Sequence, residues 1–149
     1  MIMLSPARER RLLQAVVTVV ALVPVLVGIA GVVYGLRIFD MHAGVSRDGD
    51  SQVRYLSGLL VAIGLGFWST VPRIDAQGAR FRLLTALVLI GGFARLYALA
   101  RSGMPAASML AGLALELLIT PGLAIWREGL EARAKCSEAA SAAAQQEAR

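Results

Sequence analysis

The chain has 149 residues, of which 57% are hydrophobic and 17% are charged, and its formal net charge is +5. A typical soluble domain has about 45–50% apolar and about 25% charged residues, so the composition argues against a soluble domain. The basic residues lie at the ends of apolar runs rather than on one face, which argues against nucleic-acid binding. The composition therefore indicates an integral membrane protein.

Four apolar runs follow one another along the chain. They predict helices over residues of about 12–36, 52–71, 82–100 and 106–126. A helix rises about 1.5 Å per residue and the hydrocarbon core is about 30 Å thick, so each run can cross a membrane with help from flanking arginines. No run alternates with period two, and a soluble four-helix bundle would need polar faces that these runs lack. We therefore predict an all-α, four-transmembrane-helix bundle over residues 1–127.

The first run follows the basic start MIMLSPARERR, which resembles the beginning of a signal peptide. The apolar stretch is much longer than the roughly 7–15 residues of a cleavable signal, so we predict an uncleaved anchor. The loop behind it contains Asp40 and His42 near Asp48 and Asp50. A metal site is one interpretation of these four side chains, but nothing in their spacing fixes a geometry. We predict a solvated polar loop without a metal.

The end of the chain, residues 128–149, is rich in Ala, Glu and Gln. We expect it to continue the fourth helix as a short polar tail in the cytoplasm and then to fray. The charge distribution predicts the same location for both termini. With four alternating helices, ten of the fifteen basic residues lie on the side of the termini, four lie on the other side, and Arg95 lies within a span. The positive-inside rule then places the N- and C-termini in the cytoplasm.

Each predicted helix carries small residues at spacings that suit helix packing. Membrane helices associate through close contacts at small residues, because lipid is as apolar as a leucine side chain. The expected packing positions are Gly31, Gly35, Gly58, Ala62, Gly66, Gly91, Gly92 and Gly112. In the fourth helix Ser108, Gly112, Glu116 and Thr120 form one i, i+4 row. This row predicts that Glu116 faces protein rather than lipid, and Pro121 is expected to bend the helix.

Two charges, Arg95 and Glu116, lie within the third and fourth predicted spans. An unpaired charge at that depth costs at least ~2.5–3.5 kcal/mol. Helical side chains lean toward the N-terminus of their own helix, and a short loop makes these two helices antiparallel neighbours, so the two charged groups converge. We predict an Arg95–Glu116 ion pair in the outer half of the membrane. The pair either ties two helices together or forms a functional centre.

Arg54 opens the second helix at its outer end. One interpretation is that its side chain extends into the outer water. The other places Arg54 above the Arg95–Glu116 pair, where two arginines against one glutamate would suit an anionic group such as a lipid headgroup or a small carboxylate. The predicted polar centre therefore comprises Arg54, Arg95, Glu116 and Thr120.

The same residues carry a resemblance to a known family. The motifs are RYLSGLL at 54–60, PRI at 72–74 with Asp75, GGFAR at 91–95, and Glu116 followed by Thr120 and Pro121. Over roughly residues 10–127 the chain resembles a widespread family of small bacterial four-helix integral membrane proteins catalogued as a domain of unknown function. The resemblance implies the fold and a bacterial inner membrane, and it implies no activity.

The leading functional hypothesis is a non-enzymatic integral membrane protein that acts as a small binding or accessory subunit. Its expected partners are membrane lipid and a larger membrane complex or a second copy of the chain, without a cofactor. A small oligomeric transporter or proton-coupled carrier that uses Glu116 is the alternative, although no inverted repeat is evident. A lipid-modifying enzyme is the second alternative. Because the sequence shows no nucleophile–base pair, metal-ligand spacing or phosphate loop, it predicts no catalytic residue.

Overall fold

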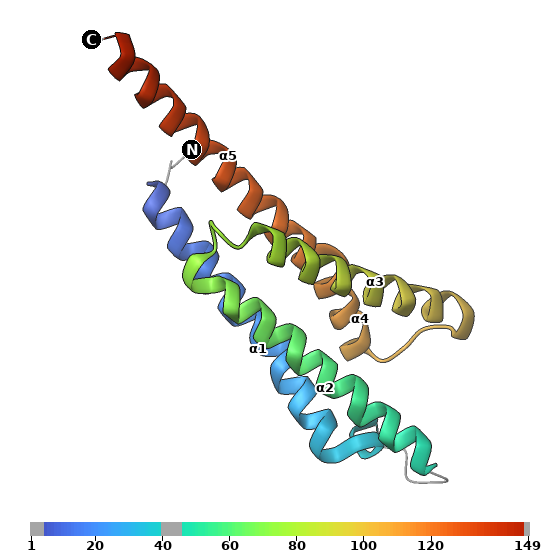
Figure 1. The fold of residues 1–149 in the computed structure, drawn as a ribbon. Helices are drawn as coiled ribbons and strands as arrows, with labels where there is room; N and C mark the ends of the chain where they lie inside the picture. The colour runs from blue at the N-terminus through green and yellow to red at the C-terminus, as the bar shows by residue number, and fades with distance from the viewer. Residues whose placement is uncertain (1–4, 40–45, 148–149) are drawn as a thin grey trace. The chain divides into compact units, whose positions relative to one another are not determined.

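The computed structural model describes residues 5–39 and 46–147, and these two stretches contain helices and no strand. Figure 1 shows the elements in chain order. They are α1 (Pro6–Tyr34), the 3₁₀ helix η1 (Gly35–Phe39), α2 (Arg47–Thr70), the 3₁₀ helix η2 (Val71–Arg73), α3 (Gly78–Ser102), α4 (Ala107–Ala114), the π-helical turn η3 (Leu115–Ile119) and α5 (Thr120–Glu147). The predicted all-helical fold class is confirmed. Asp40 and His42 of the first loop lie outside the described residues.

Four segments of the described chain are long and apolar enough to cross a membrane. They are Pro6–Arg37, Arg47–Arg73, Gly78–Ser102 and Ala107–Ser137. The helices extend beyond the predicted apolar runs because their polar ends are stabilised locally. In α2, for example, the Ser46 hydroxyl accepts a hydrogen bond from the Gly49 backbone N–H at 2.9 Å, which is N-capping. Apolar patterning marks only the part of each helix that meets lipid, so it could not reveal these ends.

The chain divides into two compact units, which are described separately. The first, called here the α1–α2 unit, is Gln14–Pro72. The second, called here the α3–α5 unit, combines Arg73–Arg149 with the start of α1, Met1–Leu13. That all four spans form one bundle stays a prediction.

Glycines bring α1 and α2 into close contact within the α1–α2 unit. A Cβ atom added at Gly31 would lie 2.1 Å from Ser57 Oγ, and one added at Gly28 would lie 2.6 Å from Val61 Cγ2. On α2, a Cβ atom at Gly64 would lie 2.5 Å from Val25 Cγ2. Only residues without a side chain let the two backbones approach this closely. Gly31, one of the expected packing positions, therefore lies at a close approach of the two helices.

The small-residue row predicted for α2 does not make these contacts. A Cβ atom added at Gly58 would meet nothing within 4 Å, and Ala62 is exposed. Gly66 is half-buried. The α2 residues that contact α1 are instead Ser57 and Val61, each one position before Gly58 and Ala62 in the sequence. One residue along an α-helix is a rotation of about 100°, so a row offset by one residue presents a different face.

The end of α1 needs a glycine for a different reason. Gly35 has φ of +58°, and a Cβ atom there would lie 2.0 Å from Asp50 Oδ1. Positive φ is easily reached only by glycine, so Gly35 ends α1 and begins η1. At the opposite end of the unit, Trp68 Nε1 donates to the Thr18 carbonyl at 3.0 Å, and Gln14 Nε2 donates to the Val71 carbonyl at 2.7 Å.

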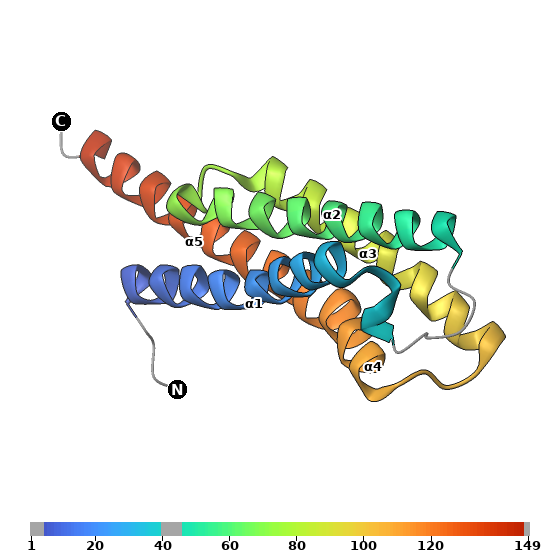
Figure 2. The same ribbon diagram turned by 90° about the horizontal axis from the view of Figure 1, so that it is seen from below.

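In the α3–α5 unit, α3 lies beside α4, η3 and α5 (Figure 2). A Cβ atom added at Gly92 would lie 2.6 Å from Leu117 Cδ2 and 3.1 Å from Glu116 Cβ, so Gly92 lies at a close contact with η3. The neighbouring Gly91 is exposed, and an added Cβ atom there would meet nothing within 4 Å, so it makes no close contact within this unit. Gly112 lies more loosely, with Arg95 Cζ 3.9 Å from an added Cβ atom.

The fourth predicted span is interrupted by the π-helical turn η3. Pro121 lacks the backbone N–H that would bond to the carbonyl four residues earlier, so a regular α-helix would lose a hydrogen bond here. The Thr120 backbone N–H instead bonds to the Leu115 carbonyl, and the Thr120 hydroxyl donates to the same oxygen at 2.8 Å. The extra residue in this turn changes the helical register, so the predicted i, i+4 row does not continue regularly from Glu116 to Thr120.

Candidate functional site

Arg95 of α3 and Glu116 of η3 form a two-pronged ion pair. Arg95 Nε donates to Glu116 Oε2 and Arg95 Nη2 donates to Glu116 Oε1, both at 3.0 Å. The third guanidinium nitrogen, Nη1, points to Met109 Sδ of α4 at 3.0 Å. Parallel hydrogen bonds between a guanidinium and a carboxylate are stronger and more directional than single ones. The pair predicted from the sequence is therefore present.

The backbone around this pair explains its geometry. The contact between Gly92 and Leu117 brings η3 against α3, which places Glu116 within reach of Arg95 one helical turn further along. The π-helical turn holds Glu116 itself, and π turns are frequent at functional sites because they alter where a side chain points. Thr120 supports the turn through Leu115 rather than contacting the ion pair. Its role here is structural, although the sequence analysis placed it in the polar centre.

The surroundings of the ion pair are apolar and open. The Arg95 side chain is 38% exposed and the Glu116 side chain is 20% exposed. Exposed large hydrophobic side chains stand close to both residues in the sequence, namely Phe93 and Leu96 on α3 and Leu118 and Ile119 on η3. The pair is thus a polar spot on an apolar surface, where a polar or charged group from another molecule could meet both a donor and an acceptor. Among the described residues no group of three His, Cys, Asp or Glu side chains could hold a metal ion.

Arg54 has its own counter-ion within the α1–α2 unit. Arg54 Nε donates to Asp50 Oδ2 at 2.7 Å, and Asp50 Oδ1 accepts the Leu36 backbone N–H at 3.0 Å. Arg54 Nη1 donates to the carbonyl oxygens of Val32 and Val33 near the end of α1. The excess positive charge expected from Arg54 is therefore compensated by Asp50. The i, i+4 spacing of Asp50 and Arg54 was a sequence signal for this pair that the charge argument overlooked.

Among the described residues, Arg127 of α5 is a deeply buried charge that was not predicted from the sequence, with a side chain only 2% exposed. Arg127 Nε donates to the Ile74 carbonyl and Nη2 donates to the Asp75 carbonyl, both at 2.8 Å. Nη2 also lies 2.9 Å from Glu131 Oε2. The guanidinium lies against Gly78, where a Cβ atom would be 2.6 Å from Nη2. In the sequence Arg127 is one of several basic residues that follow the fourth apolar run. No sequence pattern distinguishes a buried arginine at a helix end from an exposed one.

A second polar network joins the start of α1 to α5 in the same unit. Glu9 Oε1 accepts hydrogen bonds from Trp126 Nε1 at 3.0 Å and from Arg133 Nη2 at 2.7 Å. Arg10 Nε lies 2.7 Å from Asp75 Oδ2. The loop before α3, the beginning of α1 and the middle of α5 are therefore connected by side chains at one end of the α3–α5 unit.

One known protein family matches the chain, and the matched residues include the Arg95–Glu116 pair, the Asp50–Arg54 pair and Arg127. Residues 12–127 match the model described as Domain of unknown function (DUF4345). The chain belongs to this family. No curated protein and no solved structure matches the chain significantly. The four long apolar helices show that this DUF4345 protein is a multi-pass membrane protein, as predicted.

Several structural contacts of the DUF4345 chain fall on the motifs singled out in the sequence. The PRI stretch and Asp75 supply the carbonyl groups that bind Arg127. GGFAR supplies the tight glycine and the arginine of the ion pair. Thr120 and Pro121 follow the π-helical turn that carries Glu116. The motifs therefore coincide with contacts that hold the DUF4345 fold together.

Proposed function

We propose that this protein is a non-enzymatic subunit of a bacterial inner membrane assembly, with cytoplasmic termini, and that it binds its partner through the Arg95–Glu116 pair. The partner is a membrane-spanning segment that presents a polar group to this pair. The observation that carries the proposal is the two-pronged ion pair, internally satisfied but partly exposed, on an otherwise apolar surface. Polar side chains are costly in lipid and associate with other polar groups there.

Several features support a binding role over a catalytic one. Glu116 is held by both of its oxygens, so it is positioned as an acceptor and not as an acid ready to donate a proton. The exposed apolar residues beside the pair provide the surface that a second span would cover. The pair has its cation on α3 and its anion on η3, so a partner with the complementary arrangement of charges could bind in only one orientation.

Exchanging the two charges tests this proposal. The double variant Arg95→Glu with Glu116→Arg is expected to reach wild-type amounts in the membrane, because a reversed pair still neutralises both charges. Its complex should nevertheless be lost, because a partner matched to the wild-type order meets like charges. The mass of the particle extracted in native nanodiscs measures this loss.

The matched control exchanges an exposed ion pair elsewhere, Arg82→Glu with Glu128→Arg, whose atoms lie 3.7 Å apart in the wild type. This control should retain the full complex. A wild-type particle with the mass of one chain would refute the subunit proposal. If the double variant Arg95→Glu with Glu116→Arg kept its complex, the order of charges in the pair would not determine partner binding.

A proton-coupled carrier is a second candidate, favoured by the π-helical turn that carries the intramembrane Glu116. In proteoliposomes, such a carrier would show pH-dependent ion flux that Glu116→Gln abolishes and Glu128→Gln leaves unchanged. Glu128 is an exposed acid outside this turn and serves as the control. Absence of flux with every cation and anion tried would exclude the carrier.

A further inference from the structure

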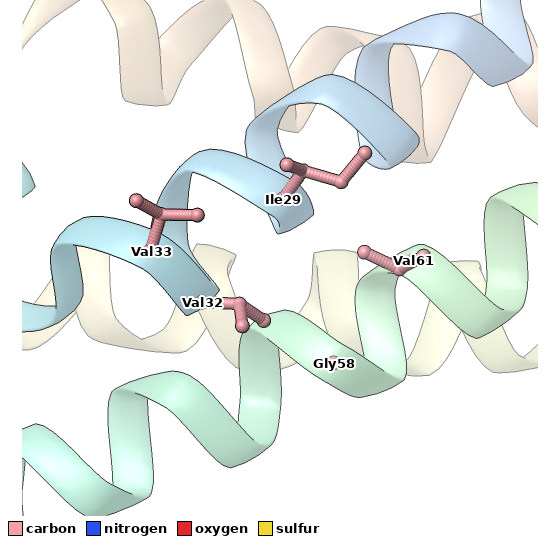
Figure 3. A pocket seen from close by; sticks show the side chains of 5 residues that line it. All are labelled: Ile29, Val32, Val33, Gly58 and Val61. Atoms are coloured by element: carbon pink, nitrogen blue, oxygen red, sulfur yellow. The ribbon is translucent and has the colours of Figure 1, made fainter.

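A shallow apolar groove lies between α1 and α2 within the α1–α2 unit. It has a volume of about 290 Å³ and is lined by Ile29, Val32, Val33, Gly58 and Val61. Figure 3 shows these residues on facing turns of the two helices, with Gly58 adding no side chain to the α2 wall. The space at Gly58 is open, since an added Cβ atom would touch nothing within 4 Å. The groove is therefore kept free by a glycine that the helix packing does not need.

A guanidinium group lies at one end of this groove. Arg54 is one helical turn before Gly58, and its Nη1 donates to the carbonyl oxygens of Val32 and Val33, two of the groove residues. Asp50 fixes the orientation of this side chain through Arg54 Nε. The Arg54 side chain is nevertheless 42% exposed.

The groove and the charge are ordered as in a phospholipid. In the antiparallel α1–α2 pair, the groove runs from Val33 and Arg54 near the end of α1 toward Ile29 and Val61, deeper in the apolar parts of both helices. A phospholipid likewise has a phosphate at the membrane surface and acyl chains that extend inward. Arginine is well suited to phosphate because its planar fork of N–H groups matches the phosphate oxygens.

We propose that this groove binds one phospholipid, with an acyl chain against Gly58 and Val61 and the phosphate beside Arg54. The site is separate from the Arg95–Glu116 pair, and neither proposal depends on the other. A soluble organic ligand fits less well, because the groove walls are apolar and only one end carries a charged group. A second copy of the chain could also cover the groove, but an apolar helix would offer no additional acceptor to the Arg54 guanidinium, which already pairs with Asp50.

The experiment uses the full chain reconstituted in vesicles of phosphatidylcholine, phosphatidylglycerol and diacylglycerol, followed by native mass spectrometry of the released protein. Wild-type protein should retain one phospholipid, whereas diacylglycerol, which has the same acyl chains without phosphate, should not be retained. Gly58→Leu fills the groove and should reduce the retained lipid at least tenfold. Gly91→Leu is the matched control, because Gly91 is likewise a helical glycine with nothing within 4 Å of an added Cβ atom, and it should retain lipid as the wild type does.

Arg54→Gln is expected to abolish the preference for phospholipid over diacylglycerol. If that variant does not accumulate because the bonds to Asp50 and α1 are lost, the Gly58→Leu comparison decides alone. Equal lipid retention by Gly58→Leu and wild type would overturn the proposal, as would equal loss in Gly91→Leu. A change from dimer to monomer in Gly58→Leu without lipid loss would identify a second copy as the occupant and overturn it too.

Discussion

Replacing Arg127 by Leu is expected to lower the free energy of unfolding by about 3 kcal/mol or more. The substitution removes hydrogen bonds to two carbonyl groups, at Ile74 and Asp75, and each bond from a charged donor contributes about 1.5–3 kcal/mol. It also leaves the carbonyl of the buried Ile74 without this donor. Unfolding of the purified protein in mixed micelles, followed by circular dichroism during titration with dodecyl sulfate, measures the loss.

Two further variants make this result specific to Arg127. Arg127→Lys should lose less stability than Arg127→Leu, because a single ammonium group can still reach one of the two carbonyl oxygens. It cannot reproduce the paired N–H groups of the guanidinium. Arg133→Leu removes a cation from the same helix, but that side chain is 64% exposed, and its loss should cost less than about 1 kcal/mol. If Arg127→Leu and Arg133→Leu unfold at the same detergent ratio, the buried arginine does not hold the loop to α5.

Removing only the cation of the Arg95–Glu116 pair should destabilise the protein more than removing both charges. Arg95→Leu leaves the Glu116 carboxylate unpaired within the span, which costs at least ~2.5 kcal/mol. The double variant Arg95→Leu with Glu116→Leu leaves no charge to bury and should recover most of that loss, because apolar replacement of an ion pair is often close to neutral. The same detergent titration measures both variants.

The third member of this series is Glu116→Leu, which leaves Arg95 unpaired. Arg95 has a long side chain that is already 38% exposed, so its charge can extend toward the membrane surface. We therefore expect Glu116→Leu to lose less stability than Arg95→Leu. A double variant as unstable as Arg95→Leu would show that the two side chains stabilise the fold by packing and not by neutralising each other.

Direction and spacing along single helices were enough to predict the main contact of the candidate site. Arg95 and Glu116 lie on helices joined by a short connection, and side chains on antiparallel neighbours lean toward each other. Their pairing could therefore be inferred without coordinates. The partner of Arg54 within its own unit is Asp50, one turn away on the same helix, and the sequence interpretation had weighed only charges between helices.

Contacts that depend on rotation about a helix axis could not be predicted as well. In the sequence, nothing distinguishes Gly58 and Gly91 from Gly31 and Gly92 as packing positions. All four lie in apolar helices at spacings that suit a packing row. Which of them meets a neighbour depends on a rotation of about 100° per residue, which the composition of one helix does not fix. The π-helical turn at Leu115–Ile119 adds to this uncertainty, since it changes the register of the fourth span.

By itself, the sequence determined that the chain is helical and crosses a membrane, because four long apolar runs must pair their backbone groups internally in lipid. It also determined that Arg95 and Glu116 need a partner there. Only the tertiary structure decided which glycines pack and that Arg127 is buried against the loop before α3. Burial depends on chain segments more than fifty residues apart, whereas hydrophobic patterning reports only how each helix meets its solvent.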